Sequence, residues 1–298
     1  MRTIDIKDKI AILGVEIPSF DSFLQIGDLT ALRQDSNGEF YRSNYERGLL
    51  LYSLVAKQRP RVILEFGTGR GYGAVCMARA LAENGIDGSV YTIDQRRYNE
   101  KQFWVLDDGN GPRLESLAWS DVWPNHFPAS WLERIHCLNG LSVDVMRRWK
   151  VAGLPEIEFT YIDGGHDYAT VKHDFYSMLR VAAPSFQVLF DDYAQKPGFG
   201  VCRLIDAEIA PAFQTELIWS DRRWYGAERE HHKTADYGMV IIESSRVNAP
   251  LHRSYPRAKV GAYLSLYRAR LRLKRPLVKA RDIAKPIAKR VTFRRRSF

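Results

Sequence analysis

Short apolar runs alternate with longer amphipathic stretches through most of the chain. The runs predict strands, and the stretches with apolar residues three or four positions apart predict helices. The predicted strands are 62–64, 89–93, 134–138, 157–162 and 186–190, and the predicted helices are 45–57, 73–83 and 168–181. Two later apolar segments, 217–220 and 237–243, suit a closing antiparallel pair. This alternation is typical of an α/β, doubly wound sheet of five or more parallel strands with helices on both faces.

Three segments lie outside this regular pattern. Residues 1–44 mix short apolar pieces with a polar turn, and we interpret them as an N-terminal cap. Residues 95–132 form a long excursion rich in Trp and Pro, too apolar for a disordered linker, which we expect to cover the active site. The chain is therefore divided into the cap, an α/β domain over 45–245 and a basic C-terminal tail over 246–298.

Charge separates the tail from the rest of the chain. Residues 246–298 hold 17 Lys and Arg and one acid, a net charge of +16, whereas residues 1–245 hold 27 basic and 34 acidic residues, a net charge of −7. Between Tyr263 and Val278 the basic residues interleave with leucines. Basic amphipathic stretches bind anionic membrane surfaces or nucleic acid. The tail is predicted to dock on a membrane surface, with nucleic-acid binding or a solvated extension as alternatives.

Composition favours a cytoplasmic protein. No run of 18 or more apolar residues is present, and Asp5, Lys7 and Asp8 stand where a signal peptide would be apolar. The three cysteines are odd in number and far apart, which fits neither a disulfide framework nor a metal site. The expected location is the cytoplasm, at the inner membrane surface if the tail docks there.

A glycine-rich turn directly follows the first predicted strand. Its glycines are spaced Gly67-x-Gly69-x-Gly71, and Glu65 precedes them by two residues. Glycines after a buried strand let the backbone approach a ligand closely. The spacing differs from the G-x-G-x-x-G of dinucleotide-binding folds. Asp94 closes the second strand, where a carboxylate can accept both hydroxyls of a ribose.

These features resemble the class I S-adenosylmethionine-dependent methyltransferase family over roughly residues 45–245. The resemblance implies a Rossmann-like sheet, with Glu65 near the amino-acid end of the cofactor and Asp94 on its ribose. The segment 139–142 matches the one that borders the adenine. The implied cofactor-binding residues are Glu65, Gly67, Thr68, Gly69, Gly71, Asp94, Gln95, Leu141 and Ser142. The alternatives are a nonenzymatic α/β domain with a bare glycine turn, and a nicotinamide enzyme.

Three carboxylates end two further strands: Asp163 follows the fourth, and Asp191 and Asp192 follow the fifth. The carboxyl ends of neighbouring strands open onto the same crevice, where three such charges would repel one another without a cation. Hard oxygen ligands suit Mg²⁺, which would lower the pKa of a bound substrate hydroxyl and orient its oxygen. The simpler alternatives are a helix cap at Asp163 and polar loop residues at Asp191 and Asp192.

The same two segments resemble the metal-dependent small-molecule O-methyltransferases, including the macrolide and aminocoumarin sugar enzymes and the cephalosporin-biosynthesis type. The resemblance implies Asp163, Asp191 and Asp192 as metal ligands. It also implies Asp163 and His166 as catalytic residues, with His166 as the general base because imidazole titrates near neutrality. The chain departs from the sugar enzymes, which carry an acid near position 165 or 166.

Three other segments are candidates for contact with ligands. Residues 45–48, Tyr-Glu-Arg-Gly, resemble the segment that closes over the cofactor in relatives. The loop residues 231–233 and the aromatic pair 224–225 are candidates for substrate contact, with a solvated loop and core packing as the simpler alternatives. The Asn/Asp-Pro-Pro-aromatic signature of amino methylation is absent after the fourth strand, which argues against DNA adenine methylation.

The sequence thus predicts an S-adenosylmethionine-dependent, Mg²⁺-assisted O-methyltransferase. Its expected acceptor is a hydroxyl of a sugar, a glycolipid or a glycosylated metabolite. The rivals are an RNA methyltransferase that binds phosphate with its tail, and a binding protein without catalytic activity. The identity of the acceptor and the oligomeric state stay open.

Overall fold

The computed structural model describes residues 1–42, 45–194, 200–220, 238–244 and 255–272. The chain divides into two compact units, Met1–Leu251 and His252–Phe298. The first unit contains the α/β domain, and the second contains a helix over 257–272. Within the described ranges, no helix is long and apolar enough to cross a membrane.

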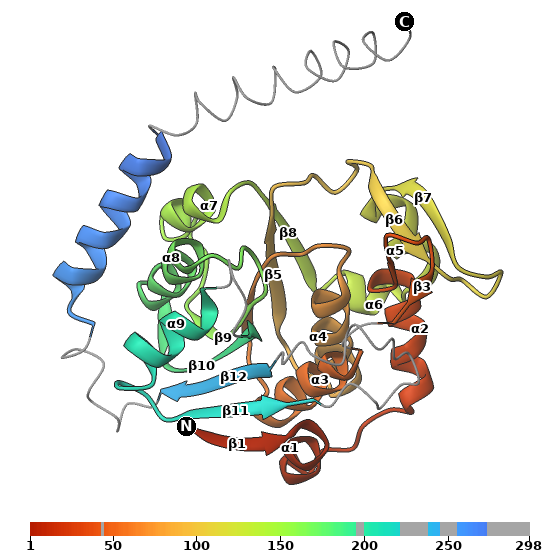
Figure 1. The fold of residues 1–298 in the computed structure, drawn as a ribbon, viewed down its shortest axis with the longest axis horizontal. Helices are drawn as coiled ribbons and strands as arrows, with labels where there is room; N and C mark the ends of the chain where they lie inside the picture. Colours follow the sequence, from red (N-terminus) through yellow and green to blue (C-terminus); the bar gives the residue numbers. More distant parts are fainter. Residues whose placement is uncertain (43–44, 195–199, 221–237, 245–254, 273–298) are drawn as a thin grey trace, which may run out of the picture. The chain divides into compact units, whose positions relative to one another are not determined.

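An eight-stranded sheet runs through the first unit in the order β1-β11-β12-β10-β9-β4-β5-β8 (Figure 1). The strands β10, β9, β4, β5 and β8 are parallel, and β12 runs antiparallel to both β10 and β11. The predicted doubly wound sheet is therefore confirmed. β1, which lies in the predicted cap, extends the sheet by pairing in parallel with β11. The strands are β1 (Arg2–Asp5), β4 (Val62–Phe66), β5 (Ser89–Asp94), β8 (Ile135–Asn139), β9 (Ile157–Ile162), β10 (Ala182–Tyr193), β11 (Thr215–Trp219) and β12 (Gly238–Ser244).

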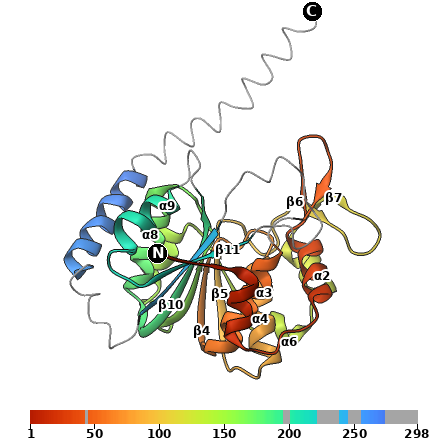
Figure 2. The same cartoon turned by 60° about the horizontal axis from the view of Figure 1, so that its bottom comes forward.

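Helices cover both faces of this sheet (Figure 2). On one face lie α3 and α4, with α1 and α2 packed against them, and on the other lie α8 and α9. A π-helical turn, Ile205–Ile209, continues α9. The helices are α1 (Ile6–Leu13), α2 (Phe20–Thr30), α3 (Glu46–Gln58), α4 (Tyr72–Glu83), α5 (Trp119–His126), α6 (Ala129–Leu132), α7 (Ser142–Arg148), α8 (Tyr168–Leu179) and α9 (Val201–Leu204).

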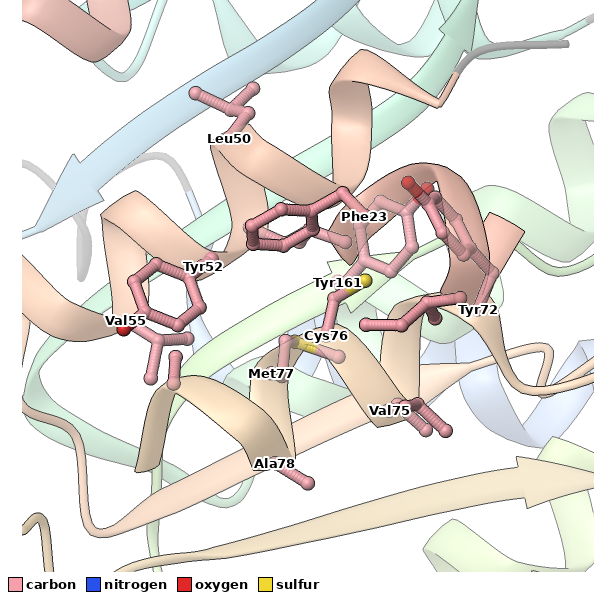
Figure 3. Close-up of a cluster of buried hydrophobic side chains, with 14 of the residues drawn as sticks. Phe23, Leu50, Tyr52, Val55, Tyr72, Val75, Cys76, Met77, Ala78 and Tyr161 are labelled. Carbon is pink, nitrogen blue, oxygen red and sulfur yellow. The ribbon is translucent and has the colours of Figure 1, made fainter. Parts of the chain in front are cut away.

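The core between α3, α4 and the sheet is aromatic as well as aliphatic (Figure 3). Phe23 of α2 meets Tyr52 of α3 edge to face, with ring centroids 5.6 Å apart. Tyr72 of α4 and Tyr161 of β9 are also fully buried, and Tyr72 donates a hydrogen bond to the carbonyl of Tyr45. This packing fixes the start of α3 over the carboxyl ends of β9 and β4.

Gly48 allows α3 to approach α4 closely. A Cβ atom at this position would lie 2.3 Å from Tyr72 Oη and 2.9 Å from Cys76 Sγ. The residue before Gly48 is Arg47, so the close contact also sets the position of a charged side chain at the start of α3.

We predict that Gly48→Ala destabilises the protein, because overpacking costs about 1–3 kcal/mol and exceeds the gain of about 1 kcal/mol in helix propensity. Gly261→Ala is the matched control, since Gly261 is also helical and a Cβ there meets nothing within 4 Å. Urea unfolding followed by circular dichroism compares the two variants. A Gly48→Ala protein as stable as the wild type would contradict this account of the helix contact.

Candidate active site

The glycine turn between β4 and α4 has a backbone that side chains would not permit. Gly67, Gly69 and Gly71 have positive φ angles of 92°, 57° and 103°. A Cβ at Gly67 would lie 2.3 Å from the carbonyl oxygen of Asp163, and one at Gly71 would lie 2.2 Å from the ring of Trp123. The turn is therefore packed between the end of β9 and α5.

Glu65 lies at the end of β4, almost fully buried beneath this turn. Its Oε2 atom accepts a hydrogen bond of 2.5 Å from Thr92 Oγ1, and Thr92 is in turn 2.5 Å from Thr68 Oγ1. Gly73 leaves room for the carboxyl group, since a Cβ there would lie 2.2 Å from Glu65 Oε1. Burial raises the pKa of Glu65 to about 8, with the Thr92 hydrogen bond acting in the opposite direction.

Asp94 lies at the end of β5, on the other side of the turn. Its carboxylate accepts hydrogen bonds from the backbone N–H of Gly69, at 3.1 Å, and from that of Arg96, at 3.0 Å. A carboxylate has about four acceptor positions, so capacity for further donors remains. The carboxylate borders a cleft of about 440 Å³ that Trp119 and Asn139 also line.

Three other predicted cofactor residues, Gln95, Leu141 and Ser142, are not among the residues that line this cleft. Gln95 is exposed, and its carbonyl oxygen accepts a hydrogen bond of 2.7 Å from Asn139 Nδ2. Leu141 precedes α7, and the Ser142 hydroxyl donates to Asp174 Oδ1 at 2.6 Å. The Ser142 side chain is thus bound to α8, and neither Leu141 nor Ser142 lines the cleft beside Asp94.

A second cleft of about 340 Å³ brings the predicted cofactor and catalytic residues together. It is lined by Glu65 and the turn residues from β4, by Asp163 and His166 from the β9 loop, and by Asp192 from β10. Residues from three other segments complete its wall: Arg33, Arg47, Gln102 and Phe103. Glu65 and the glycine turn therefore share one cleft with the predicted catalytic residues, whereas Asp94 borders the other cleft.

Asp163 and Asp191 share a buried cation from α3. Arg47 Nη1 lies 2.9 Å from Asp191 Oδ2 and 3.2 Å from Asp163 Oδ2. The Tyr161 hydroxyl donates to the same two oxygens, at 2.5 Å and 3.2 Å respectively. Burial nonetheless raises the pKa of Asp163 to about 7, against the opposing charge of Arg47.

Asp192 faces a different partner from its neighbour Asp191. Its backbone has a positive φ of 57°, which is uncommon for a residue with a side chain, and its Oδ2 atom lies 2.8 Å from His166 Nδ1. The contact with Asp192 raises the pKa of His166. Burial raises the pKa of Asp192, but His166 more than offsets this and the net pKa is lowered. The His166 ring and the Asp192 carboxylate thus face each other at the edge of the cleft, with His166 about half exposed.

The predicted metal ligands are therefore divided between two partners within the chain itself. Asp163 and Asp191 bind Arg47, whereas Asp192 binds His166. Among the residues that the structure describes, no group of three or more His, Cys, Asp or Glu is placed to hold a metal ion. Nor does Asp163 cap the following helix, because the cap of α8 is Asp167, whose carboxylate accepts from two backbone N–H groups.

Comparison with known proteins identifies the domain that carries these residues. Residues 64–193, which extend from β4 to the end of β10, match a protein family described as a methyltransferase domain. These residues form a methyltransferase domain.

Solved structures with a similar fold include two O-methyltransferases. One, from Bacillus cereus in complex with SAH, has 18% identity and a TM-score of 0.48, over 78% of this chain and 94% of the other. The other is TomG from Streptomyces achromogenes, involved in tomaymycin synthesis and in complex with SAM, with 16% identity and a TM-score of 0.50 over 78% and 92%. At this identity the likeness concerns the fold. A comparison with curated protein sequences found no match.

The excursion over 95–132 contacts the turn of the methyltransferase directly. It contains a hairpin, β6 (Gln102–Leu106) and β7 (Arg113–Leu117), followed by α5 and α6. Trp119 Nε1 donates to the carbonyl of Gly69 at 3.0 Å, and Trp123 Nε1 donates to that of Arg70 at 3.1 Å. Indole groups of the excursion thus hold the outer side of the turn.

Sequence reasoning missed the partner of the two aspartates. Arg47 lies 116 and 144 positions before them, and its segment was linked to the cofactor alone. The one available signal was the placement of a basic residue at the start of the helix that precedes β4. The candidate substrate residues 224–225 and 231–233 lie outside the described part of the chain.

We predict that the stability of the methyltransferase falls as pH rises between the ordinary range of a glutamate and about 8. In this window the folded state keeps a proton on Glu65 that the unfolded chain has released. Glu65→Gln is neutral throughout, so its stability should fall less between pH 5 and pH 8.5, as measured by urea denaturation. Glu16→Gln, at an exposed position, is the control. Equal pH dependence in wild type and Glu65→Gln would contradict the burial of an acid at this site.

Proposed function

We propose that this methyltransferase transfers a methyl group from S-adenosylmethionine to a hydroxyl of a small acceptor. The observation that carries the proposal is the shared cleft, in which the His166–Asp192 pair lies on the same wall as Glu65 and the glycine turn. A base beside the cofactor turn suits an acceptor that must lose a proton.

The residues of the turn fit this cofactor. Gly69 leaves open space against the backbone, since a Cβ there would meet nothing within 4 Å, and acids lie on both sides of the turn. Glu65 would bind the amino group at the methionine end, and Asp94 would accept the ribose hydroxyls from the first cleft. An ammonium group beside Glu65 would favour its ionised form, so binding at neutral pH would release a proton.

The chemical step is a displacement in line with the bond that breaks. S-adenosylmethionine supplies a methyl group on a positively charged sulfur, whose bond to carbon breaks and leaves its electron pair on sulfur. The acceptor oxygen forms the new bond to carbon, and its proton passes to His166 Nε2. Because Nδ1 faces Asp192, the carboxylate orients the ring and stabilises the imidazolium that forms.

The predicted assistance by Mg²⁺ stays a prediction. The oxygens of Asp163, Asp191 and Asp192 have the chemistry that Mg²⁺ prefers, but in this arrangement they do not fit a three-carboxylate site, because Arg47 and His166 occupy them. No step of the proposed mechanism therefore passes through a metal ion.

For the acceptor we propose a hydroxyl on a sugar, a glycolipid or a glycosylated metabolite. The lining of the cleft also offers polar groups, from Arg33 and from Gln102, whose Nε2 donates to the carbonyl of Gly69 at 3.3 Å, together with one exposed aromatic ring, Phe103. Polar side chains around an aromatic surface suit the hydroxyl groups and the flat apolar face of a sugar ring.

A methyl-transfer screen tests the proposed function. Purified full-length protein would be incubated with S-adenosylmethionine labelled in its methyl group and with panels of sugars, lipid-linked sugars and structured RNA. Label in a sugar or glycolipid that is stable to mild base supports the proposal. Label in RNA alone would favour the rival RNA enzyme, and binding of S-adenosylmethionine with no transfer to any panel would favour a binding protein.

We also propose that the tail contacts a membrane, on the basis of its basic helix. Within 257–272, Tyr263 and Tyr267 stack with ring centroids 6.2 Å apart, and arginines at 268, 270 and 272 follow. Aromatic residues beside arginines on one helix suit an anionic bilayer surface, where each charge contributes about 1 kcal/mol.

We predict that the pH dependence of turnover reports His166. Turnover should rise with pH as His166 loses its proton, since only the neutral ring can act as base. Asp192 raises the pKa of His166, so Asp192→Asn should move this rise to lower pH and reduce the limiting turnover. His166→Ala should reduce turnover by about 10²-fold or more without weakening cofactor affinity. An unchanged pH profile in Asp192→Asn would refute the role of the pair.

We also predict that a chain ending at Ser245 binds S-adenosylmethionine but not vesicles. The last described strand of the sheet, β12, ends at Ser244, and the residues after Ser245 carry a net charge of +16. Intact protein should sediment with anionic vesicles at low salt and less at high salt, because salt screens surface charge. Equal sedimentation of the two chains would exclude the tail as the membrane contact, whereas selective RNA binding by the intact chain would favour the RNA rival.

A further inference from the structure

The Asp163–Asp191 pair is bound by a side chain that reaches it from a distant segment. Arg47 Nη1 lies within 3.2 Å of both Oδ2 atoms, and the Arg47 side chain is only 13% exposed. Asp191 is more deeply buried, with 4% of its side chain exposed. A buried charge is costly unless it is paired, so this contact offsets part of the cost of burying the guanidinium and the two carboxyl groups.

Further contacts keep Arg47 in this position. Its guanidinium carbon lies 5.5 Å from the centre of the Tyr72 ring, over which it makes a cation–π contact. The close packing at Gly48 sets the distance of α3 from that ring. The Tyr161 hydroxyl donates to the same carboxylate oxygens as Arg47. Donors from α3 and β9 thus converge on two carboxylate oxygens at the carboxyl ends of the strands.

A divalent cation would need the oxygens that Arg47 already binds. Mg²⁺ binds carboxylate oxygens at about 2.0–2.1 Å in a strict octahedron. A guanidinium nitrogen about 3 Å from both oxygens fills the space between them, so the two cations exclude each other. The third carboxylate, Asp192, is directed to His166 and adds no ligand to the pair.

We propose that Arg47 is the resident cation of this site and takes the place of a metal ion in the methyltransferase. Arg47 pairs with Asp163 and Asp191 beside the cleft, while deprotonation of the acceptor is left to the His166–Asp192 pair. The role given to Arg47 in the reaction rests on the proposed function. The competition between Arg47 and a metal ion follows from the geometry alone.

Titration calorimetry with Mn²⁺, a spectroscopically visible substitute for Mg²⁺, tests the proposal on the full-length chain. Wild type treated with EDTA and then freed of it should show no saturable binding of Mn²⁺, with or without S-adenosylmethionine. Arg47→Met removes the charge, keeps a long side chain and leaves two carboxylates unpaired, so it should bind Mn²⁺ at least about tenfold more tightly, a gain of about 1.4 kcal/mol. Electron paramagnetic resonance of the bound Mn²⁺ should then show carboxylate coordination.

Two further variants complete the comparison. Arg47→Lys keeps the positive charge and should continue to exclude Mn²⁺. If only the shape of the arginine side chain mattered, Arg47→Lys would bind Mn²⁺ as Arg47→Met does. Arg148→Met, on the exposed side of α7, is the matched control and should behave as wild type. Mn²⁺ should raise the melting temperature of Arg47→Met and leave that of Arg148→Met unchanged.

Binding of Mn²⁺ by wild type as tight as that by Arg47→Met would overturn the proposal. If Arg47→Met does not fold, the titration of wild type and Arg47→Lys still decides, since micromolar binding by either would refute a resident arginine. Calorimetry with S-adenosylmethionine on the same samples separates the two proposals. If wild type does not bind S-adenosylmethionine, the result counts against the proposed function, whereas the Mn²⁺ titration tests the role of Arg47 alone.

Discussion

The closeness of two strand ends is the constraint on which the rest of the site depends. A Cβ at Gly67 would lie 2.3 Å from the carbonyl oxygen of Asp163, so the end of β4 and the end of β9 can meet only through glycine. Backbone hydrogen bonds of 3.0 Å join Asp163 to Phe66 and Gly67 to Ile93. Three neighbouring strands are thereby tied into one rim, and each carries an acid at or near its end.

The acids at this rim are stabilised in different ways, which explains how so much negative charge can be concentrated there. Glu65, whose pKa burial raises to about 8, is mainly protonated at neutral pH in the absence of a ligand. Asp94 is held by backbone N–H groups. Asp163 and Asp191 are paired with Arg47, and Asp192 contacts His166. In the proposed mechanism, binding and catalysis are separated accordingly, because the first two acids are assigned to the cofactor and the His166–Asp192 pair to the acceptor.

The fold could be predicted because its signals are local. A strand such as 157–162 is a continuous apolar run, and the glycines at 67, 69 and 71 mark a turn that only they can form. The positions of the acids at strand ends followed from the same pattern. The partners of these acids could not be predicted, since the Arg47 contact joins residues more than 100 positions apart and depends on the packing of α3. The positive φ of Asp192, which lies in β10, has no visible signal in the sequence.

The central claim is that the turn between β4 and α4 binds S-adenosylmethionine, and titration calorimetry on folded proteins measures this most directly. Gly67→Val places a branched side chain against Asp163, and Asp94→Ala removes the carboxylate proposed to bind the ribose. Asp108→Ala, which removes an acid of the β6–β7 hairpin paired with Arg113, is the control. The account predicts that the first two variants bind at least about tenfold more weakly than wild type, because a charge-assisted hydrogen bond contributes about 1.5–3 kcal/mol. Wild-type affinity in both variants would contradict it.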